Sequence, residues 1–219
     1  MKNLKISTRL SGAFALLMLM LVGLAVAAMA QLSSMRAATV EITENWLPSI
    51  EVVNAIDAEA AMLRLIALNH IMNTDDAAMA KIDQQLIAGR EKQMQLRKKY
   101  EALINSPEEK ELYDEFASNW TKYIAANDTA LAHSRKNEND QARAIMEGES
   151  AKQYAIIEGF LDKLVKLNAD GAAQSKNDAD TTYTTARNML LITAALAIAV
   201  AIAAAVWLIR SITAPLARA

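Results

Sequence analysis

The sequence predicts an all-α protein, in which an antiparallel up-down four-helix bundle is flanked by two transmembrane helices. Three observations lead to this fold class. The 219-residue chain has only three prolines and six glycines, and no alternating polar and apolar run bounded by turn residues. Two stretches, 10–30 and 189–209, carry no charge at all. Scarce proline and glycine favour long helices, and about 20 apolar residues are needed to cross a bilayer.

The charges outside these two stretches are distributed unevenly. All 25 acidic residues but only 18 of the 23 basic ones lie in 31–188, which gives this middle part a net charge of −7. Basic residues flank the outer ends of both apolar stretches, so the positive-inside rule places both termini in the cytoplasm and the middle outside. A middle part with this negative charge is a poor nucleic-acid binder, because phosphate binding requires a basic surface. We predict five segments: a cytoplasmic N-terminus at 1–9, transmembrane helix 1 at 10–30, an external domain at 31–188, transmembrane helix 2 at 189–209 and a cytoplasmic entry segment at 210–219.

The first apolar stretch has a second interpretation. Ala28-Met29-Ala30 is similar to a signal-peptidase site that follows a basic N-terminal region. The stretch is longer than a usual signal-peptide core, and the helical pattern continues past it, which favours an uncleaved anchor. The chain has no cysteine, so no disulfide bond is expected in the external domain.

Three short breaks divide the external domain into four helices. At Asn73–Asp76, the Thr and Asp side chains suit the N-cap of a helix that begins near residue 77. At 105–109, Ser106, Pro107 and Glu109 form the pattern of a capping box with proline at the first helical position. In the third break, 134–140, Asn137 or Asn139 is the expected cap. Short connections make neighbouring helices antiparallel.

Apolar positions recur with a 3-4 spacing in these helices, as in the seam of a bundle. The predicted seams are Met79, Ile82, Leu86, Gly89, Gln93, Leu96, Tyr100 and Leu103 in the second helix, Leu112, Phe116, Asn119, Tyr123, Ala126 and Ala130 in the third, and Ala142, Ile145, Glu149, Ile156, Phe160, Leu164 and Leu167 in the fourth. The segments 31–47 and 172–188 would form a two-helix stalk. At its junction with the bundle, Pro48 either kinks the first helix or restarts it, with Asn45 as a weak cap.

The two ends of the chain resemble bacterial methyl-accepting chemotaxis proteins. "MKNLKISTRLSGAFALLMLMLVGLAV" is similar to their opening, "NWLPSI" (45–50) to the first-helix motif of their sensor bundle, and "LIRSITAPLAR" (208–218) to the entry into a HAMP linker, with Pro215 at the proline of that linker. The resemblance implies a two-pass receptor of the bacterial inner membrane with a periplasmic sensor bundle at 31–188. It also implies a homodimer that signals through HAMP to a methylated cytoplasmic hairpin and its kinase and adaptor partners.

Arg64 is the only charged residue in an otherwise apolar run from Ala60 to Leu68. In an up-down bundle the other helices offer polar side chains at the same height, and arginine grips carboxylates in a bidentate way. Receptors similar to this one bind ligands between helices one and four through first-helix arginines. The candidate ligand-binding residues are Arg64, Asn69, Arg90, Tyr123, Lys152, Gln153 and Tyr154. Alternatively, Arg64 snorkels to water or pairs with Asp57 or Glu59, the two tyrosines pack in the seams, and Arg90 and Lys152 are solvated surface charges.

The expected ligand is a small organic acid, a di- or tricarboxylate, and no cofactor or catalytic constellation is expected.

 There is no glycine-rich phosphate loop, cysteine nucleophile or defensible Ser/His/Asp order. His70 and His133 are expected at the surface, without a third ligand for a metal site. Two alternatives share this external bundle: a sensor histidine kinase or nucleotide cyclase, and a receptor that reads a periplasmic binding protein. The sequence leaves open the identity of the ligand, the sign of the response, and whether the pocket lies within one subunit or across a dimer.

Overall fold

The structure, a computed structural model, describes residues 6–216, and these residues contain no strand. The predicted all-α class is therefore confirmed. The chain divides into two compact units, one formed by Glu41–Gln174 and the other by Met1–Val40 together with Ser175–Ala219. The two units are described separately below, as the bundle unit and the apolar unit.

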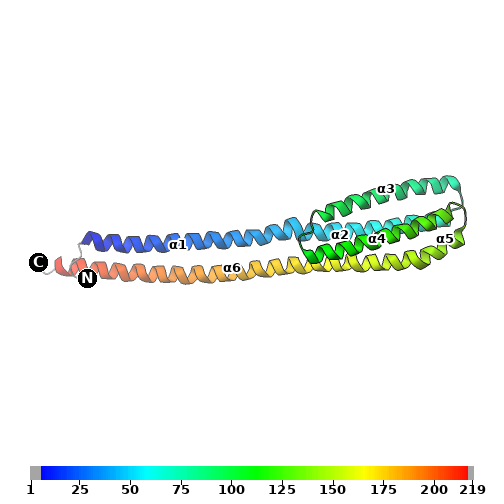
Figure 1. Ribbon diagram of the computed structural model, residues 1–219. Coiled ribbons are helices and arrows are strands. Elements are labelled where there is room, and N and C mark those ends of the chain that lie inside the picture. Colours follow the sequence, from blue (N-terminus) through cyan, green and yellow to red (C-terminus); the bar gives the residue numbers. More distant parts are fainter. Residues whose placement is uncertain (1–5, 217–219) are drawn as a thin grey trace. The chain divides into compact units, whose positions relative to one another are not determined.

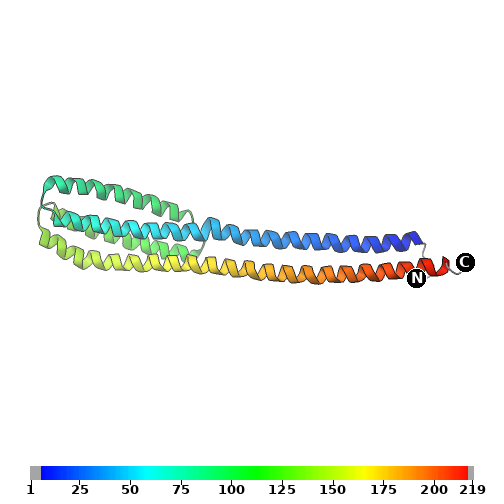
Figure 2. The same ribbon diagram turned by 180° about the vertical axis from the view of Figure 1, so that it is seen from behind.

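The bundle unit is a four-helix bundle, as predicted. Its first three helices are α2 (Leu47–Met72), α3 (Asp76–Glu101) and α4 (Pro107–Ser134). The fourth consists of α5 (Asn139–Ile145), the π-helical turn η2 (Met146–Ser150) and the first part of α6 (Ala151–Leu216). Figures 1 and 2 show these four helices side by side, and the short connections make neighbours antiparallel.

Two of the three predicted helix starts are confirmed. Asp75 caps α3, because its carboxylate accepts a 2.7 Å hydrogen bond from the backbone N–H of Ala78. The Ser106 hydroxyl accepts from the N–H of Glu109 at 3.1 Å, with proline at the first helical position of α4. The Glu109 carboxylate does not complete a standard capping box, since it accepts from the N–H of Asn105, one residue before the cap, at 3.0 Å.

The cap predicted in the third break is wrong. Asn137 has a positive φ of 59° and ends α4 rather than starting the next helix. Its N–H donates to the carbonyl of Ser134 at 2.8 Å, and the N–H of Glu138 donates to that of His133 at 3.1 Å. This pair of bonds is a Schellman motif, in which asparagine is one of the few residues that tolerate the left-handed position. Glu138 occupies the N-cap of α5 without a side-chain cap, and Asn139 follows it as the first helical residue.

Pro48 lies in the first turn of α2, as in the predicted restart, but the helix begins without a side-chain cap. The π-helical turn η1 (Ile42–Trp46) precedes α2, and the N–H of Leu47 bonds to the carbonyl of Ile42 five residues back. A proline lacks an N–H and crowds the carbonyl four residues earlier, so a wider turn accommodates it. Asn45 is not a cap: its amide donates to the carbonyl of Leu103 at 2.6 Å and accepts from the side chain of Asn105 at 2.7 Å.

The predicted seams are correct in α3 and partly correct in the other helices. In α3, six of the eight predicted positions are buried, and the remaining two, Leu96 and Leu103, are half-buried. In α4 the prediction missed six positions that are also buried, namely Glu109, Tyr113, Trp120, Asn127, Leu131 and Ser134. In the fourth helix Ala142 and Leu164 are buried as predicted, and each of the other five predicted positions lies one residue before a buried one. The buried positions are Ala142, Met146, Ser150, Gln153, Ile157, Leu161, Leu164 and Asn168.

The displacement in the fourth helix begins at Met146, where the π-helical turn η2 starts, and Leu164 beyond this turn is buried as predicted. Glu149, which was predicted to lie in the seam, is exposed, and its neighbour Ser150 is buried.

The apolar unit contains most of α1 (Ile6–Glu41) and the remainder of α6. Two helical segments, Leu10–Met72 and Asn139–Trp207, are apolar and long enough to cross a membrane, with peak mean hydropathies of 2.6 and 2.7. The residues in these most apolar windows are not buried by protein, which is consistent with a membrane protein. The predicted HAMP entry at 210–219 lies partly outside the described residues, and α6 is helical as far as Leu216.

Candidate functional site

Three of the predicted ligand-binding residues meet at one level of the bundle. The guanidinium carbon of Arg64, on α2, lies 4.9 Å from the centre of the Tyr154 ring on α6. The Tyr154 ring in turn lies 5.7 Å from that of Tyr123 on α4, centre to centre. A helix-one arginine, a helix-four tyrosine and a core tyrosine thus form a continuous row, which we call the Arg64 row.

The Arg64 row contains polar atoms that are buried but make no hydrogen bond within the described residues. These atoms are Nη1 of Arg64 and the hydroxyl of Tyr123. Oε1 of Gln153, which lies outside the row, is also buried without a hydrogen bond within the described residues. Each such atom costs about 1–3 kcal/mol relative to a paired one. Native structures keep few of them, and those that persist often serve a function. The row therefore offers two donors to a small polar molecule.

Two further polar residues at this level, Asn127 and Ser150, are not among the candidate ligand-binding residues predicted from the sequence. The hydroxyl of Ser150 donates to Oδ1 of Asn127 at 2.7 Å, and both side chains are buried. A signal was present in the sequence for one of them: Asn127 follows Tyr123 by one helical turn and shares its face. Ser150 is the last residue of η2 and lies next to Glu149, the position predicted for the seam.

The remaining predicted ligand residues do not join the row. Asn69 is exposed, and its carbonyl and side-chain oxygens accept from the amide of Asn73 at 2.8 and 3.3 Å. Lys152 is exposed. Arg90 forms an ion pair with Asp128, with Nη2 and Oδ1 2.5 Å apart. Gln153 is buried at the level of the row, but its amide nitrogen donates to Glu149 at 2.6 Å.

The electrostatic environment changes sign along this face of the bundle. Arg64 forms no salt bridge within the described residues, because Glu59, one of its expected partners, pairs with Lys92 at 2.5 Å. At the other end of this face, burial raises the pKa of Asp57 above its ordinary value, and the neighbouring carboxylates of Glu158 and Asp162 raise it further. A cation therefore stands at one end of the α2–α6 face and a group of carboxylates stands at the other.

Burial also acts on the two tyrosines of the row. It raises the pKa of the Tyr123 phenol, while Asn127 and the Arg64 guanidinium oppose this shift. The pKa of Tyr154 is raised by burial and further by Glu158 and Asp57. Both phenols are therefore neutral at physiological pH and can donate hydrogen bonds to an anion.

The histidine prediction is wrong for His70, which is fully buried at the far end of the bundle. Its Nδ1 lies 2.8 Å from the hydroxyl of Ser134, and its Nε2 lies 3.5 Å from a carboxylate oxygen of Asp83. The three side chains are those of a serine hydrolase triad, but Ser134 is buried and donates to the carbonyl of His70 itself at 3.2 Å. Asp83 is held by Arg135 through bonds of 2.6 and 3.1 Å. A catalytic nucleophile must be able to reach its substrate, which the buried Ser134 cannot do. We therefore interpret this cluster as stabilising the end of the bundle.

His133 is half-buried and lies 2.6 Å from the carboxylate of Glu138. The described residues contain no group of three or more His, Cys, Asp or Glu side chains that could hold a metal ion.

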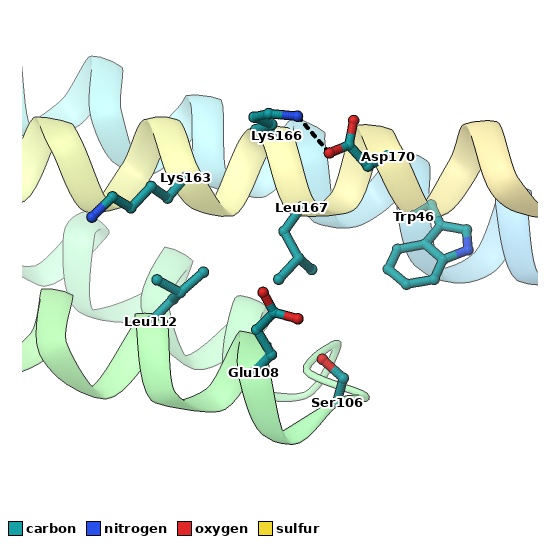
Figure 3. A pocket seen from close by; sticks show the side chains of 9 residues that line it. Trp46, Ser106, Glu108, Leu112, Lys163, Lys166, Leu167 and Asp170 are labelled. Carbon is teal, nitrogen blue, oxygen red and sulfur yellow. Dashed lines mark hydrogen bonds and ion pairs between the residues drawn. The ribbon is translucent and has the colours of Figure 1, made fainter.

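At the opposite end of the bundle unit, a groove of about 520 Å³ opens between α4 and α6. Figure 3 shows its lining, with Trp46 at one end, Glu108 and Leu112 on α4, and Leu167 on α6. The indole of Trp46 packs on Gly171 so closely that a Cβ at position 171 would lie 2.7 Å from it. None of the predicted ligand-binding residues lines this groove.

A buried polar network lies next to this groove. Glu109 is fully buried, and its Oε1 accepts from the hydroxyl of Tyr100 at 2.7 Å and from the amide of Asn168 at 3.1 Å. Together with the bond from the N–H of Asn105, three donors converge on this one carboxylate. Burial and the adjacent Glu109 raise the pKa of Tyr100. The network joins α3, α4 and α6 at this end of the bundle.

The structure is a four-helix bundle in a chain that also contains two helices long and apolar enough to cross a membrane. Residues 3–183 match the family described as the four helix bundle sensory module for signal transduction, and the chain belongs to this family. The match supports the sensor domain of the methyl-accepting chemotaxis type. No individual curated protein matches the chain.

Proposed function

We propose that the chain is the sensory part of a transmembrane chemoreceptor, with residues 31–188 in the periplasm and both termini in the cytoplasm. Its bundle would bind a small organic acid and transmit a helix displacement through the second span into a HAMP linker. The family match and the two apolar helices support this proposal. The observation that carries it is the Arg64 guanidinium, which lies against Tyr154 with Nη1 buried and unpaired.

The proposed ligand binds through a carboxylate at the Arg64 row. A guanidinium offers two parallel N–H donors to a carboxylate, and charge-assisted hydrogen bonds of this kind are worth more than neutral ones. The hydroxyl of Tyr123 is the third donor. The carboxylates of Asp57 and Glu158 lie below, so a second acidic group of a di- or tricarboxylate would have to point toward the other end of the bundle. An amino group, in contrast, would be attracted to them.

We further propose that the site is completed by a second copy of the chain. Arg64 and Tyr154 are only half-buried, and α2 carries large apolar side chains that are exposed beside them. Met62 and Leu65 are 51% and 61% exposed, and Met72 is 80% exposed. Exposed apolar side chains that recur along one helix suit a helix-to-helix dimer contact. A dimer through α2 would enclose a ligand at Arg64.

A ligand can move the bundle only through its different affinity for two states. In the proposed mechanism, the ligand draws together Arg64 on α2 and the helix that carries Tyr154. Displacements of about 1–2 Å between packed helices are usual in such transitions. Since α6 is one helix from Ala151 to Leu216, a movement at Tyr154 is passed along the same helix toward the second span.

The test is calorimetry on the full chain in nanodiscs, with succinate, citrate and aspartate as probes. We expect at least one acid to bind, and Arg64→Gln to weaken its affinity by at least about tenfold, because a charged hydrogen bond contributes about 1.5–3 kcal/mol. The matched control is Lys152→Gln, which removes an exposed cation at the same level and should leave the affinity unchanged. Undiminished binding by the Arg64 variant would remove this residue from the site.

Two alternatives for the output remain tied to the same bundle, namely a sensor kinase or nucleotide cyclase and a receptor for a periplasmic binding protein. A long glutamine- and glutamate-rich helical hairpin following residue 219 in the natural protein would select the chemoreceptor. Binding of a partner protein without binding of any small acid would select the last alternative.

A further inference from the structure

A second groove lies in the apolar unit, between α1 and α6. We call it the interfacial groove, and its volume is about 340 Å³. Its lining is mostly apolar, with one arginine and one tyrosine. The lining residues are Ala28, Gln31, Leu32, Met35, Tyr183, Ala186, Arg187 and Leu190.

The interfacial groove crosses the expected boundary of the hydrocarbon layer. Ala28 belongs to the first uncharged stretch and Leu190 to the second, whereas Arg187 lies just outside. At 1.5 Å per residue, Arg187 is about 3 Å beyond the start of the second stretch at Met189, and Tyr183 is about 9 Å beyond it. The depth of the guanidinium rests on the proposed membrane spans: since the headgroup region adds roughly 5–7 Å to each side of the hydrocarbon core, the guanidinium would lie at the depth of the lipid phosphates.

Among the ion pairs of the described residues, none involves Arg187. Arg187 is exposed, and its Nη2 donates a hydrogen bond to Oδ1 of Asn188 at 3.4 Å. Arg36 is exposed on α1, close beyond the end of the first stretch. The sequence has no acidic residue before Glu41 and none after Asp180, and Asp180 pairs with Lys176 at 2.9 Å. An anion from outside the chain is therefore the natural counter-charge.

We propose that the interfacial groove binds an anionic phospholipid of the leaflet next to the sensor bundle. Its phosphate would pair with Arg187, and an acyl chain would lie along Leu32, Met35 and Leu190. Such a ligand is anionic at one end and apolar at the other, as the groove requires. A second copy of the chain fits less well, because a two-fold contact here would bring two arginines together without a carboxylate.

The experiment uses the full chain in nanodiscs that contain equal amounts of phosphatidylglycerol and phosphatidylcholine. After detergent extraction, mass spectrometry counts the lipids retained per chain. We expect phosphatidylglycerol to be retained preferentially, and Arg187→Gln to reduce this preference roughly fivefold, as is usual for one basic residue at an anionic surface. The matched control is Arg210→Gln, which removes an exposed arginine beyond the other end of the same apolar stretch. It should leave lipid retention at the interfacial groove unchanged.

A second variant tests the acyl-chain part of the groove. Ala186→Trp fills the groove without a change in charge, and we expect it to reduce retention of both lipids. Equal retention of the two lipids by the unaltered chain, or an unchanged preference in Arg187→Gln, would overturn the proposal. So would rapid disulfide formation between chains that carry Met35→Cys as their only cysteine, since a second copy would then cover the groove.

Discussion

The contact between Trp46 and Gly171 allows a stability prediction to be worked out from distances. A Cβ added at position 171 would lie 2.7 Å from Cη2 of the indole and 2.8 Å from Cζ2 and Cζ3. Carbon atoms in contact are about 3.5–4.0 Å apart, so the rigid ring would have to withdraw by roughly 0.8 Å. Overpacking of this kind costs about 1–3 kcal/mol. The gain from replacing a helical glycine by alanine is about 1 kcal/mol, so Gly171→Ala should be neutral or destabilising by up to about 2 kcal/mol.

Gly159, in the same helix, provides the matched control. Nothing lies within 4 Å of a Cβ built at position 159, so Gly159→Ala should stabilise the bundle by about 1 kcal/mol. For a chain of this size, that corresponds to a rise in Tm of about 2–4 °C. Thermal unfolding of the full chain in nanodiscs, followed by circular dichroism, measures both variants. In a Trp46→Leu background, Gly171→Ala should raise Tm as Gly159→Ala does. If Gly171→Ala raised Tm equally in the unaltered chain, the close packing of the indole would be refuted.

Three further predictions concern the two ends of the bundle. Burial lowers the pKa of His70 below its ordinary value of 6.5. The unfolded chain therefore binds more protons near that pH, and the stability of the fold should decrease as the pH drops below about 6.5. Melting curves between pH 5 and 8 should show a weaker pH dependence of Tm in His70→Gln, and an identical pH dependence would contradict the lowered pKa of His70. Glu109→Ala should destabilise the fold by about 3 kcal/mol or more, because several buried donors lose their acceptor. Glu108 is exposed, so Glu108→Ala should change the free energy of unfolding by less than about 0.5 kcal/mol. Chemical unfolding measures both variants. Asp75→Ala should cost about 1 kcal/mol through loss of the cap of α3, and the neighbouring Asp76→Ala, which removes no cap, should cost less in the same assay.

Much of the fold could be predicted because it depends on local patterns. The scarcity of proline and glycine, the 3-4 spacing and the two uncharged stretches were sufficient for the four-helix bundle and its apolar helices. The cap at Ser106 followed from residue type and spacing alone. Asn137 was misjudged because asparagine favours both an N-cap and the left-handed end of a helix, and the sequence does not distinguish these two positions.

The candidate site was only partly predictable, for a different reason. Placing Arg64, Tyr123 and Tyr154 at one level required helix lengths and antiparallel packing, both of which the sequence supplies. The partner of Arg90 could not be foreseen, because its ion pair with Asp128 depends on the rotation of α3 against α4. His70 was expected at the surface, since its burial depends on Ser134 and on the Asp83–Arg135 pair, which come from distant parts of the chain.

The π-helical turns have a consequence for how this sequence can vary. A turn of this kind holds one residue more than the surrounding helix needs, so a deletion within Met146–Ser150 could be absorbed by closing it into an ordinary turn. The same deletion in α3, where no such slack exists, would rotate every later side chain of that helix by about 100°. Single-residue gaps among homologues should therefore gather at 42–46 and 146–150, and the helices between them should keep a constant length.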